Sequence, residues 1–269
     1  MKRREFLAAS AATLALSAMD LSRADDKPAE TSSRQLIELR IYNFTSPEKM
    51  KAYEDFLAGA GVAAFNRAGV SPVGIFKLMK GDNAELKLTE DGMDLYVLLT
   101  HKSTDSVLSL TSTLNADEEL QKACAALAET QKDPAYKRYE SSLLLAFPKA
   151  PAVLTPAKGP DRVFQLRIYE SHNAERAKMK MHMFNDGGEL DVFQKCGMTW
   201  VFFGQSLVGS KMPNLHYMLG FDDMKAQKAA WDGFKKHPGW LKLKDDPMYK
   251  DTVSHITNLF LRPAASSQI

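Results

Sequence analysis

The residues Leu39-Arg40-Ile41-Tyr42 recur later in the chain as Leu166-Arg167-Ile168-Tyr169. A second pair of segments follows in the same order, Asp133-Pro134-Ala135-Tyr136-Lys137 and Asp246-Pro247-Met248-Tyr249-Lys250. Each copy then ends in an apolar run that stops at a proline. Three matches in one order indicate a tandem duplication, so we expect two copies of one structural unit.

Hydrophobic periodicity predicts the elements within each copy. Alternation with a period of two indicates half-buried strands, and apolar residues at three- and four-residue spacing indicate helices. Ser46 followed by Pro47 is a favoured helix start, and Gly69 is a favoured end. In the first copy we expect strands at 35–44, 73–78, 95–100 and 142–147, with helices at 47–68 and 117–131. In the second copy we expect strands at 163–169, 199–204, 215–221 and 253–261, with helices at 174–196 and 223–236.

The order β-α-β-β-α-β in each copy is the ferredoxin-like pattern of an α+β fold. Its antiparallel sheet carries helices on one face and leaves the other face to be covered. Two tandem copies can cover each other sheet to sheet, which predicts a fused α/β barrel. We place the first ferredoxin-like unit at 35–148, a proline-rich linker at 149–161 and the second unit at 162–263.

The N-terminus has the pattern of an export signal. Arg3 and Arg4 precede a short apolar stretch, and Ser22-Arg23-Ala24 has small residues where cleavage requires them. The paired arginines indicate a twin-arginine signal over 1–24, followed by a flexible leader at 25–34. The prediction is a periplasmic or secreted protein without a stable membrane anchor after cleavage. A general secretion signal, or a short anchor if cleavage fails, stays open.

The charge and the absence of several motifs exclude some classes of function. The chain has 35 Lys+Arg against 33 Asp+Glu, and the first 24 residues hold four of the former and two of the latter. The remainder is formally neutral, so nucleic acid is not an expected partner. The sequence has no G-x-S-x-G elbow, phosphate loop, dinucleotide fingerprint or paired zinc spacing. We therefore expect no metal and no bound cofactor, and the sequence assigns no catalytic residue.

Three motifs resemble those of the NIPSNAP family: the opening Glu38-Leu39-Arg40-Ile41-Tyr42, the long first helix ending before a glycine, and His237-Pro238-Gly239-Trp240 with Asp246-Pro247-Met248-Tyr249. The resemblance spans about 35–262 and is closer in the second half, because the first half has no counterpart to the His-Pro-Gly-Trp motif. It implies the dimeric α/β-barrel superfamily, which includes cofactor-free monooxygenases and haem enzymes. The family itself has no settled reaction.

Five residues are candidates for binding a ligand. In both copies we expect the aliphatic face of the first strand to pack against helices, which turns Arg40, Tyr42, Arg167 and Tyr169 toward the barrel interior. A guanidinium and a phenol there could bind a small anionic or aromatic molecule. His216, in a later strand, is the fifth candidate. The alternative is that each arginine pairs with Glu38 or another acid and only fixes the register.

Two other functions stay open: a non-enzymatic interaction or scaffold protein, and an enzyme like the cofactor-independent monooxygenases. A homo-oligomer is also open.

His101 and His255 are further strand histidines, more simply explained as structural residues. Met179, His182 and Met183 share a helix face and could hold copper, but a core stripe explains them better. Trp231, Phe234 and Trp240 are expected in the core or an interface. Whether Cys124 and Cys196 are reduced is left open.

Overall fold

The computed structural model describes residues 34–127 and 130–269, which form one compact unit. The expected signal peptide at 1–24 and nearly all of the leader lie outside the described residues. Within the described parts of the chain, no helix is long and apolar enough to cross a membrane.

The first unit has the expected order of elements, with more helix than the sequence predicted. Ser46 caps the first helix by accepting a hydrogen bond from the backbone of Lys49. An additional helix, α3, precedes the expected one, and a short π-helical segment interrupts the first helix. The elements are β1 (Leu36–Asn43), α1 (Pro47–Phe56), the π-helical segment (Leu57–Gly61), α2 (Val62–Arg67), β2 (Val73–Leu78), β3 (Asp94–His101), α3 (Thr104–Asn115), α4 (Glu118–Ala126) and β4 (Arg138–Ala146).

The second unit repeats this order. The predicted helix at 174–196 is two helices, because Gly188 adopts a left-handed backbone with φ +90° that breaks the first. Helix α8 was not predicted; the His237 ring accepts a hydrogen bond from the backbone of Gly239 at its start. The elements are β5 (Val163–Glu170), α5 (Ala174–Asn185), α6 (Glu189–Lys195), β6 (Thr199–Val208), β7 (Asn214–Phe221), α7 (Met224–Lys236), α8 (Pro238–Lys244) and β8 (His255–Pro263).

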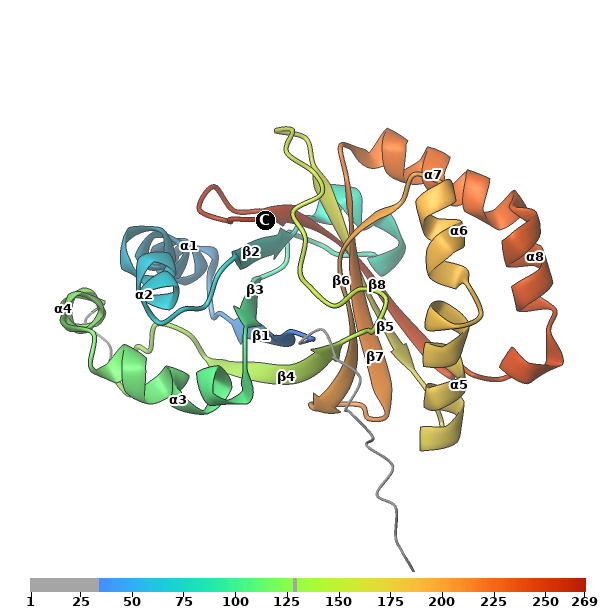
Figure 1. Ribbon diagram of the computed structural model, residues 1–269. Helices are drawn as coiled ribbons and strands as arrows, with labels where there is room; N and C mark the ends of the chain where they lie inside the picture. The colour runs from blue at the N-terminus through green and yellow to red at the C-terminus, as the bar shows by residue number, and fades with distance from the viewer. Residues whose placement is uncertain (1–33, 128–129) are drawn as a thin grey trace, which may run out of the picture. The chain divides into compact units, whose positions relative to one another are not determined.

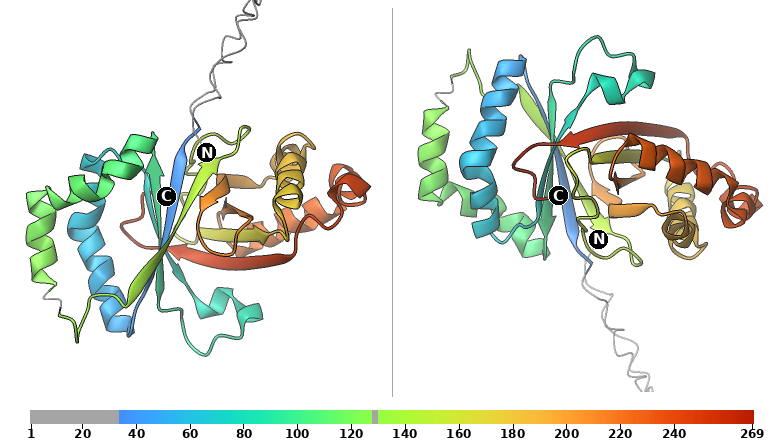
Figure 2. Two further views of the ribbon diagram at one scale, coloured as in Figure 1. Left: turned by 90° about the horizontal axis from the view of Figure 1, so that it is seen from below. Right: turned by 90° about the horizontal axis from the view of Figure 1, so that it is seen from above.

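The eight strands close into one antiparallel barrel with the order β1-β3-β2-β8-β5-β7-β6-β4. Each unit contributes four neighbouring strands, and the units join through β2 with β8 and β4 with β6. These two joints pair the sheet edges that either unit alone would expose. Helices α1–α4 cover one side of the barrel and α5–α8 the opposite side (Figures 1 and 2). The predicted α+β fold of two ferredoxin-like units closed as a barrel is confirmed.

The barrel interior holds the aliphatic face of the first strands, which corrects the predicted orientation. All eight strands contribute to one buried apolar cluster that includes Ile37, Leu39, Phe164 and Leu166. Arg40, Tyr42, Arg167 and Tyr169 point the other way, toward the helices of their own units. The prediction was wrong because both faces of this sheet are buried. Alternation then shows that the two faces differ, but not which one lies inside.

Candidate functional site

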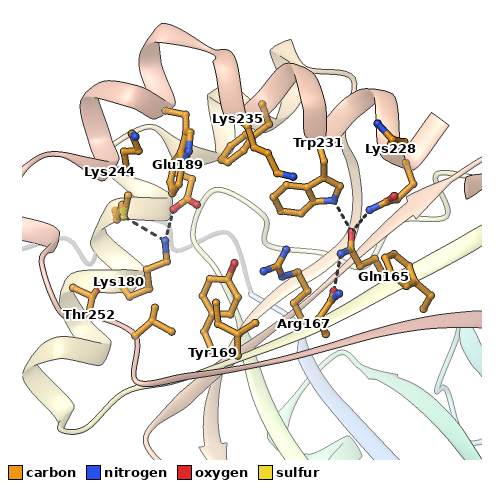
Figure 3. A pocket seen from close by; sticks show the side chains of 18 of the residues that line it. Gln165, Arg167, Tyr169, Lys180, Glu189, Lys228, Trp231, Lys235, Lys244 and Thr252 are labelled. Atoms are coloured by element: carbon orange, nitrogen blue, oxygen red, sulfur yellow. Dashed lines mark hydrogen bonds and ion pairs between the residues drawn. The ribbon is translucent and has the colours of Figure 1, made fainter. Parts of the chain in front are cut away.

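A pocket of about 840 Å³ lies in the second unit, between the sheet and the helices. Strands β5 and β8 form its floor, and helices α5, α7 and α8 form its walls and roof (Figure 3). A loop of the first unit reaches its rim. Asn83 on that loop exchanges two hydrogen bonds of 2.8 Å with the backbone of Phe260 in β8, and nearby Glu85 lines the pocket.

Arg167 rises from β5 into this pocket. Its guanidinium carbon lies 4.7 Å from the ring centroid of Trp231 and 5.3 Å from that of Tyr169. Cation–π contacts of this kind hold the group in place without consuming its N–H donors. Among the described residues, no hydrogen bond or ion pair engages the guanidinium, and its Nε is buried without a partner. This half-buried cation is therefore open to an anionic partner.

Amide side chains surround Arg167. Gln165, two residues earlier on the same face of β5, accepts hydrogen bonds from Trp231 Nε1 at 2.6 Å and from Gln227 Nε2 at 3.3 Å. Its own Nε2 donates to Asn258 Oδ1 at 2.7 Å. These contacts fix the pocket wall beside Arg167 with neutral groups only.

A buried ion pair lines the pocket nearer α6. Lys180 of α5 donates to Glu189 of α6 at 2.7 Å, and the two side chains are only 5% and 3% exposed. Burial raises the pKa of Glu189, and the charge of Lys180 opposes that shift. The ammonium also lies 4.4 Å from the centroid of the Phe184 ring. Lys180 thus has its counter-charge in direct contact, whereas no carboxylate of the described residues forms an ion pair with Arg167, and Glu189 and Glu85 act on it only from a distance (Figure 3).

The corresponding pocket of the first unit, about 510 Å³, is lined by Arg40 and Tyr42. Arg40 donates to both oxygens of Glu38, at 2.7 and 3.0 Å, and Ser141 donates to the same carboxylate at 2.7 Å. Burial would raise the pKa of Glu38, but contacts with His101 and Arg40 outweigh it and lower the pKa to about 2. In this unit Arg40 pairs with Glu38, as the structural alternative in the sequence analysis expected.

His216 lies apart from both pockets. It shares a strand with Met218 at the two-residue spacing of one sheet face, and Met218 belongs to the interior cluster. Its Nδ1 is buried without a hydrogen-bond partner in the described structure, and burial lowers the pKa of the ring to about 4. The five sequence candidates therefore occupy three separate places.

The remaining candidates have structural surroundings. His101 contacts Ser106 and Glu38, and His255 is exposed at the start of β8. His182 shares a hydrogen bond of 3.0 Å with the Tyr249 hydroxyl, while Met183 packs in a small apolar cluster. Among the described residues, no group of three or more His, Cys, Asp or Glu is placed to hold a metal. No disulfide joins Cys124 and Cys196.

Sequence reasoning missed most of the pocket in the second unit. Trp231 was expected in the core or an interface, and Gln165, Lys180 and Glu189 were not among the candidates. One signal was present in the sequence, since the repeated motif is preceded by Glu38 in the first copy and by Gln165 in the second. That single difference removes the carboxylate that would neutralise the arginine.

Comparison with known families finds a match for the second unit. Residues 164–268 match the model of the NIPSNAP family, and this segment runs from β5 through β8. The resemblance read from the sequence is confirmed for that segment, which includes the Arg167 pocket apart from its first-unit rim. No curated protein matches the chain.

Solved structures resemble the whole barrel at low identity. A proposed monooxygenase from Fusobacterium nucleatum covers 86% of this chain and 93% of its own, with 8% identity and a TM-score of 0.55. Another, from Lactobacillus acidophilus, covers 86% and 94%, with 12% identity and a TM-score of 0.52. A NIPSNAP-like domain protein from Burkholderia xenovorans covers 39% and 88%, with 12% identity and a TM-score of 0.34. The first two show the shared barrel fold.

Proposed function

We propose that this protein binds a small aromatic carboxylate in the pocket of the second unit, with Arg167 as its anchor. The observation that carries the proposal is a half-buried guanidinium, held between two rings, that has no partner among the described residues. A carboxylate matches the forked donors of arginine and forms strong charge-assisted hydrogen bonds with them. Burial strengthens that attraction, because little water competes for the charge.

The walls of the pocket support an aromatic ligand of modest size. Trp231, Phe234, Trp240 and Phe260 line it together with Tyr169, and its volume falls in the range of about 300–1,000 Å³ usual for small-molecule sites. The lining also has an excess of positive charge, which favours the approach of an anion. Its basic residues are Arg167, Lys180, Lys228, Lys235 and Lys244, against Glu85 and Glu189.

Calorimetric titration with benzoate and 2-naphthoate tests the proposal, with benzyl alcohol as an uncharged comparison. Arg167→Met should weaken carboxylate binding by about 2–5 kcal/mol, the cost of losing a desolvated charge pair. Arg40→Met is the matched control in the first unit and should leave the affinity unchanged. Equal binding by wild type and Arg167→Met would reject Arg167 as the anchor. No binding by the wild type would favour the interaction or scaffold protein.

A second candidate is an enzyme like the cofactor-independent monooxygenases. Glu189 favours it, because a buried carboxylate whose pKa is raised by burial lines the same pocket and could accept a proton from a bound phenol or enol. An electron-rich anion formed in this way can itself reduce oxygen. Oxygen uptake with 1,4-dihydroxy-2-naphthoate, compared between wild type and Glu189→Gln, tests this candidate. Uptake at the same rate in both would reject it.

We also propose that the protein is exported and that its two units arose by tandem duplication. The support for a periplasmic or secreted location is the sequence of residues 1–24, with Arg3 and Arg4 before an apolar stretch. The support for a tandem duplication is the repeated Leu-Arg-Ile-Tyr motif at the same place in both units. Changing Arg3 and Arg4 together to Lys should leave unprocessed protein in the cytoplasm. Normal processing would point to the general secretion route.

A further inference from the structure

The two arginines sit in matching sets of three residues. Arg40 in β1 lies opposite Ser141 of β4 in the antiparallel register, and Arg167 in β5 lies opposite Asn258 of β8. The residue two positions before each arginine, Glu38 or Gln165, points to the same face of the sheet. Equivalent backbone positions therefore present different side chains to the two pockets.

In the first unit the three residues hydrogen-bond to one another through the Glu38 carboxylate. Glu38 accepts two hydrogen bonds from Arg40 and one from Ser141. The positive charge meets its counter-charge inside the protein, and the serine hydroxyl donates to the same carboxylate. An arriving carboxylate would have to displace Glu38 from Arg40, which makes this pocket a poor anion site.

In the second unit the hydrogen bonds determine which way each amide faces. The indole Nε1 of Trp231 can only donate, so Gln165 must turn its oxygen toward Trp231 and its nitrogen toward Asn258. Asn258 accepts that bond through its oxygen, which leaves its own Nδ2 as a donor. Among the residues that the structure describes, this Nδ2 has no partner, and Asn258 lines the pocket directly across the strand pair from Arg167.

We propose that Gln165 is the residue that makes this pocket select carboxylates. Among the described residues it leaves Arg167 without a carboxylate in hydrogen-bond contact, and it turns the Asn258 amide nitrogen into a second donor for the bound anion. The inference rests on the proposed function and adds to it the residue that sets the selectivity. Gln165 acts through Arg167 and Asn258, so it is a positioning residue.

A glutamate at position 165 would convert this set into that of the first unit. Trp231 and Gln227 could donate to its carboxylate as they now donate to the amide oxygen, so the neighbours can accept the change. The new charge would lie two residues from Arg167 on the same strand face, the relation that joins Glu38 to Arg40. Asn258 would turn its nitrogen toward the new carboxylate and away from the pocket.

The experiment titrates benzoate and benzyl alcohol against the full-length protein and its Gln165→Glu variant. We expect benzoate to bind at least tenfold more weakly and benzyl alcohol to stay within threefold, because the apolar walls are unchanged. Gln194→Glu, which adds the same charge at an exposed position of α6, should keep both affinities. Asn258→Leu should weaken benzoate binding about three- to tenfold, whereas Ser141→Ala, its counterpart in the first unit, should not.

The outcomes separate this inference from the proposed function. Benzoate binding kept by Gln165→Glu but lost by Arg167→Met would overturn the role of Gln165 and leave Arg167 as the anchor. Binding kept by both variants would overturn the anchor itself, and with it the inference. If Gln165→Glu does not fold, Gln165→Met replaces it. That variant leaves Arg167 unpaired but releases Asn258, so benzoate should bind about as weakly as it does to Asn258→Leu, and unchanged binding would overturn the inference.

Discussion

The two halves of the barrel place the same four residues on equivalent strands and use them differently. In the first unit, Arg40 is locked to Glu38 and serves the stability of the sheet. In the second, Arg167 faces a pocket and contacts the rings of Tyr169 and Trp231, with no ion pair to any described residue. The difference comes from one preceding side chain, a carboxylate in one unit and an amide in the other.

This comparison shows what a repeated motif can and cannot reveal. The repetition identifies an equivalent position in the fold, because backbone geometry and register follow the shared pattern. It does not identify a shared role, because the energy of a buried cation depends on whether a counter-charge lies within about 4 Å. A structural arginine and a ligand-binding arginine can therefore share one motif.

The largest expected effect is on stability. Arg40→Met leaves the Glu38 carboxylate buried without its partner and should lower the free energy of unfolding by about 3–5 kcal/mol. Arg167→Met removes a cation that has no ion pair among the described residues, so the free energy of unfolding should change by no more than about 1 kcal/mol, the size of a cation–π contact. Urea unfolding of the two variants beside the wild type measures both. Equal destabilisation by the two substitutions would contradict the contrast between the units.

A smaller effect is expected from pH, in two separate windows. Burial lowers the pKa of His216 to about 4 from 6.5, so the unfolded chain binds this proton more tightly. Stability that is complete above pH 6.5 should fall by on the order of 3 kcal/mol as the pH drops toward 4. The pKa of Glu38, lowered to about 2, adds a further loss between about pH 4.5 and 2.

Unfolding free energies measured at several pH values between 7 and 3 separate the two groups. His216→Leu should remove the slope between pH 6.5 and 4 and keep the loss at lower pH. Glu38→Gln should do the reverse. A slope between pH 6.5 and 4 that persists in His216→Leu would show that another group is responsible.

The smallest effect concerns the rings that hold the arginines. Trp231→Phe keeps an aromatic face beside Arg167 but loses the donor to Gln165, and it weakens the cation–π contact, which is worth about 0.5–1 kcal/mol. Benzoate affinity should fall about three- to fivefold. In the first unit the Tyr139 ring lies 5.4 Å from the Arg40 guanidinium, and Tyr139→Phe should not change benzoate affinity. An equal response to both substitutions would count against a specific site at Trp231.

The fold could be predicted from the sequence because the repeat and the hydrophobic periodicity are visible in the order of the residues themselves. Alternation at 35–44 and 163–169 located β1 and β5, and the repeated order of elements led to a barrel of two units. Helices α3 and α8 were missed. Helix α8 begins at a proline, which permits a helix start but does not require one.

The candidate site could be predicted from the sequence only in part. Arg167 and Tyr169 were correctly placed together, but they face the helices and not the barrel interior. Periodicity could not decide this, since both faces of the strands are buried. The hydrogen-bond partners of Gln165 beside Arg167 are Asn258 in β8 and Trp231 in α7, which lie 93 and 66 residues away in the sequence. Only the folded chain shows that they meet.

The most direct measurement of the central claim is a crystal structure of the protein with 4-bromobenzoate, whose bromine is located by its anomalous scattering. We expect the bromine in the second unit's pocket among the aromatic walls, with the carboxylate within hydrogen-bond distance of Arg167 and Asn258 Nδ2. A carboxylate bound at Arg40, or a ligand whose carboxylate makes no contact with Arg167, would contradict the account.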